Sequence, residues 1–154
     1  MGQVDLIRYA TSLDIDEVVH SYRDYLNTLD DMPEYTDEYL HTTLLEAKQD
    51  GAIWAYSYTG ACFADLRPNY TGDALDLIVM SGTIFRLPEF ITTLCKQLID
   101  EGPYEYMWGT SEDNSRILAF WKRLSRIGLA VKMREQDDGT FKITYNGKEE
   151  RIRN

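Results

Sequence analysis

One acidic residue interrupts the most apolar stretch of this sequence. Asp76 lies between Leu75 and Leu77 in the run Ala74–Met80, which reads ALDLIVM. If this carboxylate is buried, it needs a partner, and burial favours its protonated form and tunes it toward general-base catalysis. The alternative is an outward-facing residue on a strand with one hydrated face. Asp76 is the first catalytic candidate, and the sequence leaves both interpretations open.

The histidines and cysteines give weaker signals. His20 and His41 lie in two separate expected helices, and no spacing of His, Cys and carboxylates fits a metal site. Cys62 and Cys95 fall in apolar strand and helix patterns, so we expect reduced core thiols. No phosphate-binding loop of the Walker type and no G-x-S-x-G motif is present, which argues against nucleotide hydrolysis and serine-hydrolase chemistry.

Length and charge restrict the class of protein. The chain has 154 residues and a net charge of −10, which is consistent with one folded domain over 1–154. The acidic balance argues against a nucleic-acid partner. No apolar run approaches the roughly 18 residues of a membrane span. No signal peptide opens the sequence, so we expect a cytoplasmic protein with no membrane partner.

Positive charge is concentrated in the last part of the chain. Residues 114–154 hold 10 of the 16 Lys and Arg residues but only 5 of the 26 Asp and Glu residues. Such a basic segment can attract an anionic ligand or an acidic protein surface. The alternative is a hydrated helix face followed by a charged tail.

Hydrophobic periodicity predicts alternating strands and helices in one α/β domain. Thr11 and Thr36 are expected helix caps, Tyr39 is expected on a buried helix face, and Arg67–Gly72 is expected to be a turn. The order β-α-α-β-β-β-α-β-α-β-β predicts a mixed central sheet. The expected strands cover 4–9, 53–58, 61–66, 74–80, 104–109, 130–135 and 140–145, and the expected helices cover 13–27, 37–49, 88–100 and 114–127.

This order, with the helix sequence NSRILAFWKRL at 114–124, resembles the GNAT superfamily of acetyl-CoA-dependent N-acyltransferases. Members open the last long helix with Asn, carry an aromatic residue further along it, and have Gly-Phe after it. Asn114, Trp121 and Gly128-Leu129 take these places, with Gly128 later than usual. The segment VMSGTIFRLPEF also looks like small GNAT-like internal virion proteins of short-tailed phages. That second resemblance implies a phage-encoded protein in a virion or in the host cytoplasm.

The resemblance implies an acetyl-CoA site in an opening between the strands at 74–80 and 104–109. Backbone groups of the first of these strands would bind the pantetheine arm. The loop before the following helix would bind the pyrophosphate through exposed N–H groups at the helix start. The residues implied to bind the cofactor are Ile78, Val79, Met80, Gly82, Thr83, Arg86, Asn114 and Trp121.

The loop departs from the family pattern Q/R-x-x-G-x-G/A. Arg86 matches its first residue, but no Gly-x-Gly follows. Pro88 removes one N–H from the first helical turn, and Glu89 places negative charge where a pyrophosphate would lie. Either Gly82, Thr83 and Arg86 hold CoA differently, or the loop holds none.

The catalytic assignment also departs from the family pattern. The family commonly uses a Tyr on the last long helix as the acid, and Trp121 in that place is no acid. Tyr104 or Tyr106 on the expected strand at 104–109 could substitute, and Tyr106 is the second catalytic candidate. Two hypotheses therefore remain: an N-acyltransferase acting on an amine acceptor, and a non-catalytic GNAT-fold protein that binds a protein partner. We expect a monomer or a homodimer in either case.

Overall fold

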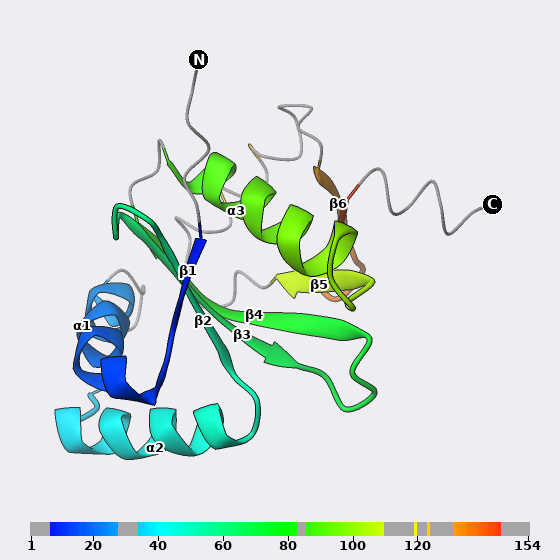
Figure 1. Ribbon diagram of the computed structural model, residues 1–154. Helices are drawn as coiled ribbons and strands as arrows, with labels where there is room; N and C mark the ends of the chain where they lie inside the picture. The colour runs from blue at the N-terminus through cyan, green and yellow to red at the C-terminus, as the bar shows by residue number, and fades with distance from the viewer. Residues whose placement is uncertain are drawn as a thin grey trace.

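The computed structural model describes residues 7–27, 34–82, 86–109, 119, 123 and 131–145. Within these ranges, one seven-stranded mixed sheet has the order β1-β2-β3-β4-β5-β7-β6 (Figure 1). The β4–β5 pair is parallel, and every other described strand pair is antiparallel. The predicted mixed α/β architecture is confirmed. The expected helix over 114–127 lies outside the described residues, apart from Ala119 and Arg123.

The elements follow the predicted order, with small changes in their bounds. The strands are β1 (Ile7–Ala10), β2 (Ile53–Ser57), β3 (Cys62–Pro68), β4 (Ala74–Gly82), β5 (Tyr106–Gly109), β6 (Val131–Glu135) and β7 (Phe141–Tyr145). The helices are α1 (Ile15–Leu26), α2 (Asp37–Gln49) and α3 (Leu87–Cys95), with a 3-10 turn η1 (Ser12–Asp14) and a π-helical turn η2 (Lys96–Asp100). None of these helices combines the length and hydrophobicity that a membrane crossing requires.

Two helical layers cover opposite faces of the sheet. Helices α1 and α2 lie on one face, and α3 lies on the other (Figure 1). Each helix buries an apolar stripe at i, i+3 or i+4 spacing, as the sequence predicted. The buried stripes comprise Val18, Val19, Tyr22 and Leu26 of α1, Leu40, Leu44 and Ala47 of α2, and Phe90, Ile91, Leu94 and Cys95 of α3.

Helix ends follow local hydrogen bonding. Thr11 begins η1 with a capping box, because its hydroxyl accepts from Leu13 N while Asp14 accepts from Thr11 N at 2.8 Å. Thr36 begins α2 by accepting from Tyr39 N at 3.0 Å. The prediction that Tyr39 is buried is wrong. Its side chain is exposed and stacks on Tyr35, with ring centroids 5.0 Å apart.

Strand β3 is longer than predicted. Arg67, expected in a turn, pairs in register with Asp76 of β4. Pro68 then ends the strand, which is consistent with a residue that has no N–H for the ladder. The extension places Arg67 on the sheet beside a catalytic candidate.

Strand β4 contains one extra residue relative to β3. Asp65 pairs with Val79, whereas Leu66 pairs with Leu77, so Ile78 is the inserted residue of a β-bulge. The bulge changes which residues share a face. Leu77 packs in the core beneath α3, whereas Val79 packs with the α1 and α2 residues instead of following Leu77.

Candidate functional site

The candidate site is the part of β4 that follows its described pairing with β5, and it is called the free edge below because the described residues give it no partner besides β3. β5 pairs with β4 from Ala74–Tyr106 to Leu77–Gly109. β4 continues to Gly82, and within the described residues the span Ile78–Gly82 pairs only with β3. At a rise of about 3.3 Å per residue, this leaves roughly 16 Å of strand edge with backbone donors and acceptors outside the described ladder.

The bulge lies where the described pairing of β4 with β5 ends. Ile78, the inserted residue, directly follows Leu77, the last β4 residue with a described partner on β5. A bulge bends its strand and increases the local twist. Ile78 is 43% exposed although its neighbours Leu77 and Val79 are buried.

Gly82 ends this edge in a conformation that requires glycine. Its φ is +143°, and a Cβ there would lie 2.6 Å from the carbonyl oxygen of Ala61 and 2.8 Å from Cys62 Cα. Any side chain would push β3 and β4 apart. Gly82 thus keeps the end of the free edge closely packed on β3.

Helix α3 begins near the end of the same edge. Arg86 is its N-cap residue, Pro88 lies in its first turn, and no side chain caps it within the described residues. The helix start offers N–H groups and a positive dipole end to an anion. Pro88 withholds one N–H, and the exposed Glu89 opposes an anion, as the sequence predicted.

The cofactor residues named from the sequence divide into three groups. Ile78, Val79, Met80 and Gly82 all lie on the free edge of β4. Val79 and Met80 are buried, so only their backbone groups are available to a ligand on that edge. Arg86 is exposed at the start of α3. Thr83, Asn114 and Trp121 lie outside the described residues.

The two catalytic candidates lie on one face of the sheet, the face opposite α3. Asp76 is partly exposed and stands directly opposite Trp108 of β5, one residue before the last β4–β5 pair. Tyr106 stands opposite Ala74, four residues before Ile78. At about 3.3 Å per residue, Asp76 lies about 7 Å and Tyr106 about 13 Å along the strands from the start of the free edge. Asp76 is therefore the nearer candidate, and it is outward-facing.

A buried charged cluster next to Asp76 was missed in the sequence. Asp65 is fully buried, and its carboxylate accepts from Arg67 Nε at 2.8 Å and from Arg67 Nη2 at 2.6 Å. The Tyr22 hydroxyl donates to the same carboxylate. Hydrogen bonding to Asp65 raises the pKa of Arg67, and burial together with Asp65 raises the pKa of Tyr22. The cluster fixes the guanidinium of Arg67, whose backbone pairs in register with Asp76.

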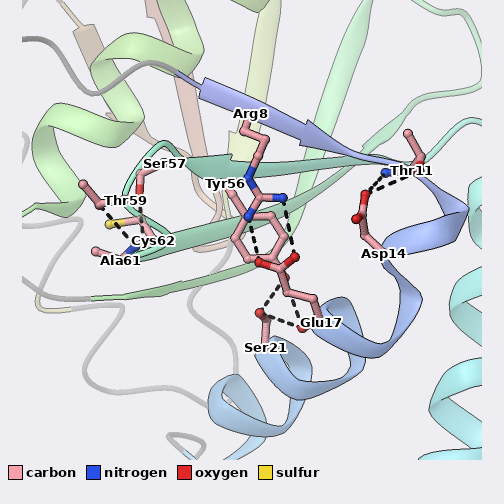
Figure 2. A network of polar contacts seen from close by, with 10 residues as sticks. All are labelled: Arg8, Thr11, Asp14, Glu17, Ser21, Tyr56, Ser57, Thr59, Ala61 and Cys62. Carbon is pink, nitrogen blue, oxygen red and sulfur yellow. Dashed lines mark hydrogen bonds and ion pairs between the residues drawn. The ribbon is translucent and has the colours of Figure 1, made fainter.

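A second polar network joins α1 to β1 and β2 (Figure 2). Arg8 Nη2 lies 2.7 Å from Glu17 Oε1, and its guanidinium lies 4.6 Å from the ring centroid of Tyr56. The Tyr56 hydroxyl is 2.6 Å from Ser21 Oγ. Burial raises the pKa of Tyr56 to about 12. These contacts hold the helical layer that flanks the face on which Asp76 lies.

The described residues contain no group of three or more His, Cys, Asp or Glu side chains that could hold a metal ion. Three kinds of group lie near the end of the described β4–β5 pairing: the backbone N–H and C=O groups of β4, the partly exposed carboxylate of Asp76, and the N-terminus of α3. Such an arrangement can bind an extended amide-containing ligand along β4 and place a proton acceptor beside it.

Comparison with solved structures identifies this fold. No family model matches the sequence, and no curated protein sequence matches it either. The chain is similar to a variant of spermidine N-acetyltransferase SpeG from Vibrio cholerae, with a TM-score of 0.59, 8% identity, and 97% and 98% of the two chains covered. It is also similar to a GNAT-superfamily phosphinothricin acetyltransferase from Sinorhizobium meliloti in complex with acetyl-CoA, with a TM-score of 0.55, 11% identity, and 92% and 87% covered.

A third similar structure is the PaiA N-acetyltransferase from Thermoplasma acidophilum in complex with coenzyme A. The TM-score is 0.56 at 12% identity, and 91% of this chain and 98% of that chain are covered. These matches span nearly the whole chain. The protein therefore has the GNAT fold.

Proposed function

We propose that this protein is an acetyl-CoA-dependent N-acyltransferase. The observation that carries the proposal is the free edge of β4 from Ile78 to Gly82, which begins at a bulge and ends near the start of α3. Neighbours with this fold include N-acetyltransferases solved with acetyl-CoA or coenzyme A, which supports the same cofactor here. Fold alone does not assign a function, so the edge geometry is the main support.

The free edge suits the cofactor's amide-containing arm. Backbone N–H and C=O groups of Ile78–Gly82 can pair with an extended ligand as an added strand would. Gly82 and Arg86 lie toward the end that would receive the diphosphate. When bound, acetyl-CoA supplies a thioester carbonyl that an amine can attack.

Asp76 is the proposed general base. It is partly exposed and lies on β4 one residue before the last described pair with β5. Its carboxylate can accept the proton of an attacking amine directly or through one water. Arg67, held by the buried Asp65, stands next to it on β3. Tyr106 remains a predicted proton donor, with its ring further from the opening than Asp76.

A second candidate function is supported by the start of α3. Pro88 and Glu89 reduce the capacity of this helix end to bind a diphosphate. A GNAT-fold protein that binds a protein partner without catalysis would tolerate both residues. The same residues in an active enzyme would instead weaken cofactor binding without abolishing it.

Isothermal titration with acetyl-CoA separates the two functions. The acyltransferase proposal predicts saturable binding with one site per chain, and amine-dependent release of the CoA thiol in a parallel thiol assay. Binding that is undetectable at millimolar acetyl-CoA would contradict it and favour the non-catalytic function. Desulfo-CoA serves as a control, since it should bind but release no thiol.

A further inference from the structure

A continuous row of polar and aromatic residues crosses five strands on the face opposite α3. Cross-strand register places these residues side by side, from β3 through β4, β5 and β7 to β6. Four of them are partly buried and the last is exposed. In spatial order the row is Arg67, Asp76, Trp108, Lys142 and Arg134.

The row forms an aromatic and cationic surface around one carboxylate. Tyr106 and Trp108 meet edge to face with ring centroids 5.3 Å apart. Lys142 Nζ lies 4.5 Å from the centroid of the Tyr106 ring, so this cation is held over the aromatic pair. Lys132 of β6 lies on the same face, because it is two residues before Arg134 on the strand.

The row lies beside the end of the described pairing of β4 and β5. The pair Asp76–Trp108 directly precedes Leu77–Gly109, the last pair that the structure describes between these two strands. Helices α1 and α2 also lie on this face (Figure 1), and α1 contacts β4. A ligand on the row would therefore lie next to a thioester that enters between the two strands.

The charges on this surface favour a particular ligand. The buried carboxylate of Asp65 forms an ion pair with Arg67, so these two charges offset each other. Across Trp108, Asp76 offers one negative charge and Lys142 one positive charge. A molecule with one amine and one anionic group complements both charges, whereas a polyamine would bring a like charge to Lys142.

We propose that this row binds the acyl acceptor, and that the acceptor is a small primary amine that also carries a carboxylate or phosphate group. This inference rests on the proposed acyltransferase function. Asp76 receives the amine, Lys142 receives the anionic group, and Trp108 forms the floor between them. Neighbouring strands lie about 4.8 Å apart, so the backbones of Asp76 and Lys142 are roughly 10 Å apart. That separation suits side chains that reach toward both ends of a short ligand.

In the proposed acetyl transfer, the nitrogen lone pair of the neutral amine forms a bond to the thioester carbonyl carbon. The carbon–sulfur bond breaks and its electron pair leaves on sulfur. The proton lost by nitrogen is accepted at Asp76 and finally passes to the thiolate, so the products are an N-acetyl compound and free CoA thiol.

Binding can be measured without the cofactor. With the full chain ¹⁵N-labelled, glutamate and O-phosphoethanolamine are the anionic-amine probes, and spermidine is the polyamine probe. The proposal predicts that at least one anionic amine shifts the indole N–H resonance of Trp108 saturably, and that spermidine at equal concentration does not. Lys142→Met, which keeps the apolar stem, should weaken that binding about tenfold, whereas Lys96→Met on η2 should leave it unchanged.

Activity gives the second readout. With acetyl-CoA present, wild-type kcat/KM should be at least tenfold higher for the better anionic amine than for spermidine. Lys142→Glu should reverse this preference, whereas the control Lys96→Met should leave it unchanged. Absence of any Trp108 shift, or a shift with spermidine that Lys142→Met does not alter, would overturn the proposed acceptor class. Failure of acetyl-CoA to bind, with the Trp108 shift intact, would instead overturn the acyltransferase function.

Discussion

Leu77 of β4 pairs in parallel register with Gly109 of β5, and the next residue of β4 is the bulged one. The bulge bends β4 where its pairing with β5 ends. It also allows Leu77 and Met80 to pack in the same core, beneath α3, although residues three positions apart in a regular strand point to opposite faces. One inserted residue thus changes the strand at the end of its described pairing with β5 and keeps the core intact.

The first prediction concerns the start of α3. Glu89→Gln should strengthen acetyl-CoA binding about two- to fivefold, because an exposed carboxylate in the first turn opposes a diphosphate by about 0.3–1 kcal/mol. The same change should slightly destabilise the helix, since Glu89 is favourable to its dipole. Titration calorimetry measures the affinity, and Glu46→Gln on α2 is the matched control. Equal affinities for wild type and Glu89→Gln would show that no anion binds at this helix end.

A second prediction tests Asp76 as the base. Asp76→Asn should lower kcat by about 10²- to 10⁴-fold, the usual contribution of a positioned general base, with little change in the Kd of acetyl-CoA. Asp24→Asn, an exposed change on α1, should leave kcat unaltered. If Asp76→Asn retains full activity, the base is another group.

The sequence predicted the element order because apolar spacing and caps are local properties. The stripe of α1, the cap at Thr36 and the final hairpin of β6 and β7 are all confirmed. The bulge at Ile78 could not be predicted, because it exists only relative to β3. The row of residues that includes Asp76 and Trp108 could not be predicted either, because the sequence of one strand does not determine its register with the next strand.

The cluster around Asp65 was missed for a different reason. The predicted strand ended at Leu66, so the two-residue spacing of Asp65 and Arg67 on one strand face was not used. Tyr22 comes from a helix that is distant in sequence, and only tertiary packing brings it to Asp65. Among the predicted cofactor residues, those of β4 rest on the apolar run and on the resemblance, which indicate the same strand.

The third prediction concerns this cluster. Asp65→Asn should lower the free energy of unfolding by about 2–3 kcal/mol, because it breaks a buried ion pair whose Arg partner can still reach water. Tyr22→Phe should cost about 1–2 kcal/mol by removing one hydrogen bond to the carboxylate. Urea unfolding measures both, with Asp24→Asn expected within about 0.5 kcal/mol of wild type. A near-neutral Asp65→Asn would contradict the assignment of Asp65 as a buried, paired carboxylate.

The fourth prediction is a loss of stability at alkaline pH. Burial raises the pKa of the Cys95 thiol from 9.0 to about 12. Above pH 9 the unfolded chain loses this proton while the folded chain keeps it, so the free energy of unfolding falls by up to about 1.4 kcal/mol per pH unit until about pH 12. Urea unfolding between pH 8 and 10 should show a shallower fall in Cys95→Ala than in wild type. Parallel slopes for the two proteins would refute the assignment to Cys95.

The most direct test of the account is an amide chemical-shift map of the ¹⁵N-labelled protein during titration with acetyl-CoA. The account predicts saturable shifts at Ile78, Val79, Met80, Ser81 and Gly82, the free edge of β4. Residues Ile53–Ser57 of β2, which pair on both sides, should shift little. Saturable binding whose shifts leave Ile78–Gly82 unchanged, or no shifts at millimolar acetyl-CoA, would contradict the claim that this edge is the cofactor site.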